Sequence, residues 1–153
     1  MCYRPLHIKA TNVYRNTNVS ASIYDVPCGK CEACRDLYRS SWKCRLWHEL
    51  ERTQKVGGTS VFLTFTYKPE TLPLININGS VVPCFNHDDV KTFLNRLKVR
   101  MYRLYGANNY KYFIAMEYGK NTKRQHLHGL FFLSSVVDWK VFTELCRELW
   151  QSK

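Results

Sequence analysis

One short segment limits the possible folds of this chain more than any other. Residues 125–133 are mostly apolar and carry two histidines one residue apart, a pattern typical of a β-strand. Because successive strand side chains point to opposite faces, His126 and His128 should share one face and Leu127 the other. Two adjacent imidazoles on a rigid strand offer half of a divalent-metal site. A solvated histidine pair on an edge strand is the simpler alternative.

Composition narrows the class of protein and the kind of partner. The chain has 153 residues, of which 45% are hydrophobic, so we expect a single folded domain over residues 1–153. A net charge of +11 favours DNA or RNA as partner, ahead of an anionic membrane surface. No apolar run is long enough to span a bilayer and the N-terminus lacks a signal-peptide core. We therefore expect no membrane partner and an intracellular location.

The hydrophobic pattern predicts an α+β fold in two parts. Residues 1–55 should contain a hairpin, a cysteine cluster and a basic helix, and residues 58–153 should form the core. Short connections between the last strands favour an antiparallel sheet with helices packed on one face. The expected elements are a hairpin over 6–26 with a turn at 16–18, helices over 35–53, 86–105 and 138–150, strands over 60–67, 110–118 and 125–133, and a loop over 69–83.

Apolar periodicity also predicts which side chains face the core. In the strand over 60–67, Phe62, Thr64 and Thr66 should lie on the face opposite the larger apolar residues. The inward positions are Val61, Leu63, Phe65 and Tyr67 in this strand, Tyr38, Trp42, Leu46 and Leu50 in the first helix, Val90, Phe93, Leu94, Leu97, Met101 and Leu104 in the second, and Val141, Phe142, Leu145 and Leu149 in the third.

Glu117 is the expected third member of the metal site. If residues 119–124 form the loop between two paired strands, Tyr118 pairs with Gln125, and Glu117 lies opposite His126 on the histidine face. One carboxylate and two imidazoles suit Mn²⁺ or Mg²⁺ with open positions for other ligands. A register slip of one residue would remove Glu117 from this face. The alternative is a surface carboxylate paired with Lys120 or Lys123.

The loop over 119–124 is basic. Lys120, Lys123 and Arg124 beside a metal site would hold a phosphate backbone without reading its sequence. We expect these three residues, with Thr64 and Thr66 of the neighbouring strand, to contact DNA. An ordinary solvated loop is the alternative.

The spacing of cysteines suggests a second metal. Three of the seven cysteines, Cys28, Cys31 and Cys34, are separated by two residues each, and Cys44 follows ten residues later. In a reducing compartment this spacing favours a structural Zn²⁺ site, with Cys44 or His48 as the fourth ligand. Reduced thiols packed in a turn are the alternative. Cys2, Cys84 and Cys146 are expected to be ordinary free cysteines.

Together these motifs resemble the histidine-hydrophobic-histidine (HUH) endonuclease superfamily. The resemblance rests on residues 62–67, on Glu117-Tyr118-Gly119 and on His126-Leu127-His128-Gly129. The cysteine segment from Pro27 to Arg35, with Trp42, Arg45 and His48-Glu49, is similar to that of the replication initiators of gokushovirus-type Microviridae phages.

The resemblance implies a function and a fold. It implies a ferredoxin-like or RNA-recognition-like sheet in which the 60–67 and 125–133 strands lie centrally. It also implies rolling-circle replication in the cytoplasm of a bacterial host, with single-stranded origin DNA as substrate and host replication proteins as possible partners. A bound metal polarises the scissile phosphate, and a tyrosine attacks to give a 5′-phosphotyrosyl enzyme and a free 3′-hydroxyl.

The sequence departs from this pattern in one respect. In such initiators the nucleophilic tyrosine follows the histidine motif, whereas this chain has no tyrosine after Tyr118. We therefore expect the chain, which ends at Lys153, to be a fragment, and the catalytic nucleophile is left unidentified. The relaxase order, with Tyr3, Tyr14 or Tyr24 as nucleophile, is the alternative.

Two other functions fit parts of the sequence. A non-catalytic, zinc-stapled module for single-stranded DNA would explain the cysteines and the charge, and its binding would not need Mn²⁺. A metal-dependent phosphodiesterase using activated water would turn over without a covalent intermediate.

Overall fold

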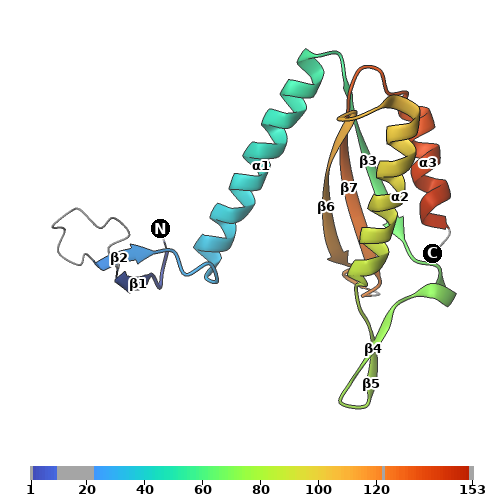
Figure 1. Ribbon diagram of the computed structural model, residues 1–153. Coiled ribbons are helices and arrows are strands. Elements are labelled where there is room, and N and C mark those ends of the chain that lie inside the picture. The colour runs from blue at the N-terminus through green and yellow to red at the C-terminus, as the bar shows by residue number, and fades with distance from the viewer. Residues whose placement is uncertain (1, 10–22, 122, 152–153) are drawn as a thin grey trace. The chain divides into compact units, whose positions relative to one another are not determined.

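The computed structural model describes residues 2–9, 23–121 and 123–151. Two compact units divide the chain at residue 48: Met1–His48 and Glu49–Lys153 (Figure 1). The helix α1 (Glu32–Lys55) crosses this boundary. The predicted α+β class is confirmed by the helices and antiparallel sheets of the described residues.

The N-terminal unit begins with a small hairpin. Strands β1 (Leu6–Lys9) and β2 (Ile23–Val26) pair antiparallel, as predicted, whereas the turn expected at 16–18 lies outside the described residues. The cysteine segment leads from β2 into α1. This helix has Glu32 in its first turn and Arg52 in its last, where the helix dipole favours an acid and a base respectively.

The C-terminal unit is built on a three-stranded antiparallel sheet in the order β3-β7-β6. Helices α2 and α3 cover one face of this sheet (Figure 1). The order β3-α2-β6-β7-α3, with β7 between the other two strands, is that of a split βαβ unit. The bounds are Thr59–Thr66 for β3, His87–Tyr105 for α2, Tyr110–Tyr118 for β6, Gln125–Leu133 for β7 and Trp139–Gln151 for α3.

One expected strand position was wrong. The resemblance placed both motif strands centrally, and β7 is central, but β3 is an edge of the sheet among the described strands. Side chains satisfy carbonyls at the end of β3. Trp150 Nε1 donates to the carbonyl of Thr66 at 2.9 Å and Arg124 Nη2 donates to that of Tyr67.

The core lies between the sheet and the two helices. Phe65 packs against Phe93 and Trp150, with ring centroids 5.0 and 5.3 Å away. Gly129 allows this packing, because a Cβ there would come within 2.6 Å of the Phe131 ring. The buried residues shared by sheet and helices include Phe65, Tyr67, Leu127, Phe131 and Leu133, Val90, Phe93, Leu97 and Met101, and Phe142, Leu145, Cys146 and Trp150.

Three predicted core positions were wrong. Leu104 and Val141 are 56% and 44% exposed, and Tyr38 is 65% exposed. Leu104 lies in the last turn of α2, just before the C-cap Gly106. In α3 the buried stripe passes instead through Cys146 and Trp150, which the periodicity argument omitted.

The predicted loop over 69–83 contains regular structure. Strands β4 (Leu74–Ile77) and β5 (Ser80–Pro83) form a hairpin, preceded by a 3₁₀ turn at Pro69–Thr71. Asn78 and Gly79 have φ of 51° and 84°, the backbone of a type I′ turn. The Asn-Gly pair between β-branched residues is a hairpin signal that the loop prediction missed. Gln125 Nε2, on the fully buried side chain at the start of β7, donates to the Pro73 carbonyl at 3.1 Å and to that of Cys84.

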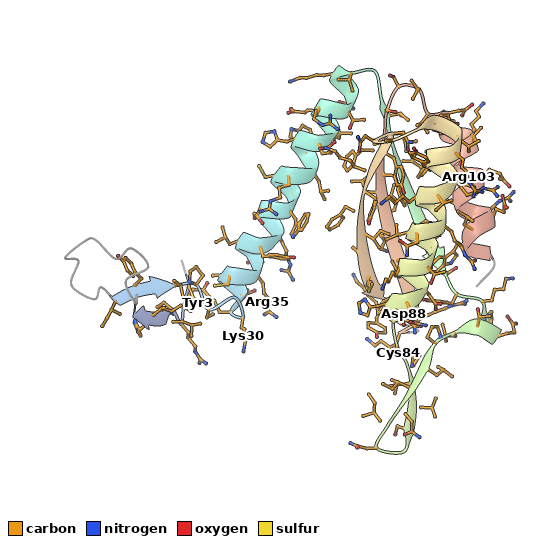
Figure 2. The ribbon with its side chains drawn as sticks, viewed as in Figure 1. Tyr3, Lys30, Arg35, Cys84, Asp88 and Arg103 are labelled. Carbon is orange, nitrogen blue, oxygen red and sulfur yellow. The ribbon has the colours of Figure 1, made fainter. Side chains whose placement is uncertain are left out.

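The predicted start of α2 is confirmed. The Asn86 side chain accepts a hydrogen bond from the Asp88 backbone N–H at 3.0 Å, so it is an N-cap. Asp88 lies in the first turn and Arg103 in the last (Figure 2), which matches the sign of the helix dipole at each end.

Candidate functional site

The sheet face opposite the helices carries the predicted site in successive rows across three strands. Glu117 pairs directly with His126, and Tyr118 with Gln125, so the predicted register is confirmed. Thr66 lies on the other side of His126. The next rows along the sheet are Thr64, His128 and Ala115, and then Phe62, Leu130 and Phe113.

Glu117 and the two histidines lie close together on this face. Glu117 Oε2 is 3.4 Å from His128 Nε2, and the two imidazole centroids are 6.0 Å apart. The Glu117 side chain is 56% exposed and that of His128 is 27% exposed. The predicted pairing of Glu117 with Lys120 or Lys123 is replaced by this contact with His128. These three side chains are therefore accessible to a metal ion and to a large substrate.

Two β3 side chains hold the ring of His128. Thr64 Oγ1 lies 3.1 Å from His128 Nδ1, and the Phe62 ring stacks on the imidazole at 5.5 Å with an interplanar angle of 16°. When His128 Nδ1–H donates to Thr64, the Nε2 lone pair faces Glu117 and is available to a metal. Thr64 thus selects the tautomer that a metal ligand needs.

The donor set fits a hard or borderline divalent cation. One carboxylate oxygen and two imidazole nitrogens suit Mn²⁺, and Mg²⁺ with more water in its shell. The face is open, so water or a phosphate oxygen could fill the remaining positions.

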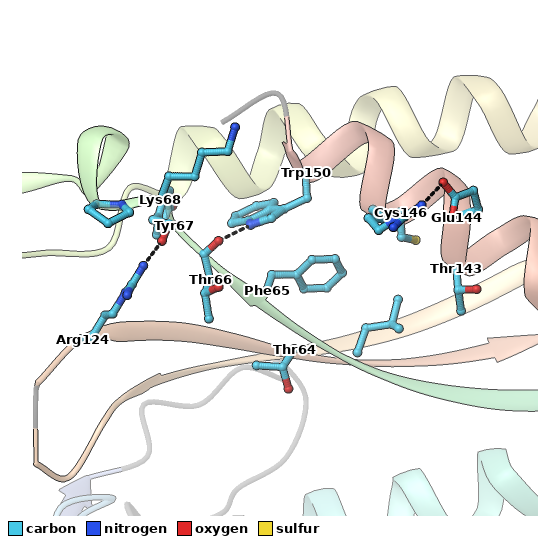
Figure 3. Close-up of a pocket in the computed structure, with 13 residues that line it drawn as sticks. Thr64, Phe65, Thr66, Tyr67, Lys68, Arg124, Thr143, Glu144, Cys146 and Trp150 are labelled. Atoms are coloured by element: carbon cyan, nitrogen blue, oxygen red, sulfur yellow. Dashed lines mark hydrogen bonds and ion pairs between the residues drawn. The ribbon is translucent and has the colours of Figure 1, made fainter.

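The residues predicted to contact DNA divide into two groups. Thr64 and Thr66 are exposed on the histidine face, and Lys120 and Lys123 are exposed in the turn that follows Tyr118. Arg124 is half-buried, with its guanidinium on the Tyr67 carbonyl (Figure 3). Its role in holding the end of β3 was not foreseen.

A groove of about 750 Å³ runs between β3 and α3. Thr66, Tyr67, Arg124, Glu144 and Trp150 are among its lining residues (Figure 3). The indole of Trp150 forms one wall and donates to the Thr66 carbonyl. The groove therefore borders the outer edge of the strand that carries Thr64 and Thr66.

A second candidate site lies in the N-terminal unit. The sulfur atoms of Cys2, Cys28, Cys31 and Cys34 all lie within 4.8 Å of one another. Among the described residues this is the one group of three or more potential metal ligands found with donor atoms gathered so closely. Cys44, predicted as the fourth ligand, is exposed on α1 and outside the group. Cys2, which was expected to be an ordinary cysteine, takes that place.

The protein backbone favours charge on two of these thiols. The N–H groups of Tyr3 and Cys34 lower the pKa of Cys31 to about 6. The N–H groups of Lys30 and Cys31 lower the pKa of Cys28. Burial raises the pKa of Cys34 to about 12. The cluster is therefore a set of thiols of which two readily become thiolates, the form that binds metal.

Comparison with known proteins agrees with this site. Residues 60–153 match the model of a family of replication-associated proteins, the ORF2 family. The chain belongs to this family. The match begins at β3 and spans both histidines and Glu117, so the family region contains the whole candidate metal site on the sheet.

Two curated relatives extend the similarity to the N-terminal unit. The replication-associated protein VP4 of Bdellovibrio phage phiMH2K is 29% identical over 99% of this chain and 48% of its own length. The replication-associated protein ORF2 of Spiroplasma virus 4 is 28% identical over 86% of this chain and 44% of its own length. The chain thus spans about half the length of these relatives and is similar to Microviridae-type replication proteins, as the sequence motifs indicated.

The chain has no match among solved structures. Within residues 2–9, 23–121 and 123–151, the helices are too short or too polar to cross a membrane.

Proposed function

We propose that this chain is the metal-binding part of a rolling-circle replication initiator that nicks single-stranded origin DNA. The observation that carries the proposal is the placement of Glu117, His126 and His128 on one exposed sheet face, inside the region that matches the replication family. The protein would act in the cytoplasm of a bacterial host, with host replication proteins as further partners.

Each part of the site has a role in this proposal. Glu117, His126 and His128 would hold Mn²⁺ or Mg²⁺, and Thr64 would orient His128 through its Nδ1. When bound, the ion would offset negative charge on the phosphoryl oxygens of the scissile phosphate. Lys120 and Lys123 would bind neighbouring phosphates, and the 64% exposed ring of Phe62 offers a surface on which a base can stack.

The proposed chemistry needs a tyrosine. Its hydroxyl oxygen would form a bond to phosphorus as the bond to the 3′ oxygen breaks, leaving a 5′-phosphotyrosine and a 3′-hydroxyl. Burial raises the pKa of Tyr67 and of Tyr110 to about 12, which makes these two poor nucleophiles. Residues 119–153 contain no tyrosine, so we propose a nucleophile from elsewhere than this stretch.

Mn²⁺ binding to the full chain tests the metal site. We expect the His126→Ala, His128→Ala double variant to lose Mn²⁺ affinity by at least tenfold in calorimetric titration. His87→Ala, which removes an exposed histidine at the start of α2, is the matched control and should bind like wild type. Equal affinity in the double variant and in wild type would contradict the proposal.

The tetracysteine group favours a second candidate, a zinc-stapled module that binds single-stranded DNA without cleaving it. A covalent-adduct assay separates the two. The chain is incubated with circular single-stranded DNA and Mn²⁺ and then denatured. DNA that stays attached would support nicking and locate the nucleophile within residues 1–153. DNA binding that is unaffected by Mn²⁺ and by loss of both histidines would favour the module, and cleavage without any adduct would favour a water-dependent phosphodiesterase.

A further inference from the structure

We infer that Cys2, Cys28, Cys31 and Cys34 bind one structural Zn²⁺ ion, which joins the N-terminus to the start of α1. This site is separate from the Glu117 and histidine site and does not depend on the proposed nicking activity. It also differs from the set expected from spacing, in which Cys44 or His48 was the fourth ligand.

The distances between sulfur atoms match a tetrahedral site. Cys2 Sγ lies 3.8 Å from Cys31 Sγ, and Cys28 Sγ lies 4.0 Å from Cys34 Sγ. With Zn–S bonds of about 2.3 Å, the edge of a tetrahedron of sulfurs is about 3.8 Å. A disulfide would need about 2.05 Å, so the four cysteines form a group that surrounds a point rather than two bonded pairs.

The backbone around the cysteines supports the same arrangement. Cys28 N–H donates to Cys2 Sγ at 3.3 Å, and Cys31 N–H donates to Cys28 Sγ at 3.4 Å. Gly29, with φ of +73°, turns the chain between them. Amide donors on sulfur offset thiolate charge, which is the usual role of groups around a metal ligand.

The charge of the segment suits a tetrathiolate. Four thiolates around Zn²⁺ leave a net charge of about −2. Lys30 and Arg35 flank the ligands in sequence and extend from the same segment (Figure 2). Thiolate ligands select Zn²⁺ over Mg²⁺ or Mn²⁺. A complete set of four protein ligands leaves no open position, so the ion is structural rather than catalytic.

The N-terminal unit needs such a ligand because it has almost no core. Among its described residues, Cys34 is the one that is buried, and a unit of this size without a core is usually held by a metal or by disulfides. Cys2 and Cys28 are 26 positions apart, and β1 and β2 lie between them. Metal binding would therefore close the hairpin and fix it to α1, and binding energy would become folding energy.

Cobalt substitution tests the site in the full chain, prepared under reducing conditions with nothing added before Met1. We expect one Co²⁺ per chain with the visible and near-ultraviolet bands of tetrahedral thiolate coordination, displaced by Zn²⁺. Cys2→Ser should remove these bands or weaken Zn²⁺ affinity at least tenfold, whereas Cys44→Ser should match wild type.

Two further measurements keep the test decisive. Cys2→His replaces a sulfur ligand by nitrogen and should retain one Co²⁺ with a shifted spectrum. The near-ultraviolet circular dichroism of the aromatic core around Trp150 reports whether the C-terminal unit stays folded in each variant. Wild-type spectra in Cys2→Ser, or loss of the bands in Cys44→Ser alone, would overturn the inference.

Discussion

Thr64 illustrates how a single side chain can prepare a metal ligand without touching the metal. Its hydroxyl is 3.1 Å from His128 Nδ1, on the ring atom opposite the one that faces Glu117. A hydrogen bond to the far nitrogen fixes both the tautomer and the ring orientation of a histidine ligand.

We predict that Thr64→Val lowers Mn²⁺ affinity about tenfold or more. Valine keeps the β-branched shape of threonine but cannot accept the proton of Nδ1, so His128 loses its orienting partner. Affinity is measured by calorimetric titration without DNA. Thr66→Val, two positions along the same exposed face, is the matched control, and a similar loss in both variants would argue against a specific role for Thr64.

At the scale of elements, α3 closes the core through its last turn. The Trp150 ring lies 5.3 Å from those of Phe65 and Tyr67 and 5.6 Å from that of Phe93. Its N–H reaches the Thr66 carbonyl at the edge of the sheet. One side chain therefore joins α3, α2 and β3.

We predict that Trp150→Phe lowers the free energy of unfolding by about 1–3 kcal/mol. The substitution removes a hydrogen bond to a strand carbonyl and leaves part of the indole volume empty. Urea unfolding, followed by far-ultraviolet circular dichroism, measures the change. Trp139→Phe, at a 50% exposed position in the first turn of the same helix, should change stability by less than about 0.5 kcal/mol. Equal effects at the two positions would show that Trp150 is not the anchor of α3.

At the scale of the whole molecule, charge is the dominant property. The net charge of +11 comes from lysines and arginines spread over both units. Phosphate contacts release counterions, so affinity for single-stranded DNA should fall linearly with salt on logarithmic axes, with a slope of about −0.7 for each phosphate neutralised. If about four phosphates are neutralised, affinity falls roughly 50-fold between 50 and 200 mM salt.

We predict that the Lys120→Ala, Lys123→Ala double variant reduces this slope by about 0.7 for each lost contact. Fluorescence anisotropy with a labelled oligonucleotide at several salt concentrations measures the slope. Lys91→Ala with Lys98→Ala removes the same charge from α2, on the helical side of the sheet. If both double variants lower the slope equally, the effect comes from overall charge and not from the turn beside Glu117.

Local periodicity in the sequence was enough to predict much of the sheet and the metal site on it. Alternation places His126 and His128 together on any strand, and the six-residue connection at 119–124 fixed Glu117 opposite His126. The N-cap Asn86 and the bounds of β6 and β7 followed from short-range signals of the same kind. These features need only neighbouring residues, so a single sequence is enough to predict them.

Contacts between distant groups, in contrast, were settled by the tertiary fold. Cys2 replaced Cys44 in the sulfur cluster because the hairpin returns the N-terminus to Cys28, a contact that the spacing within 28–44 does not contain. Trp150 rather than Val141 entered the core because it meets Phe65 and Phe93 from two other elements. Thr64 found His128 across 64 residues. Side-chain type and spacing predict what a residue can do, but the choice of partner depends on packing between elements, and packing is decided by the whole chain at once.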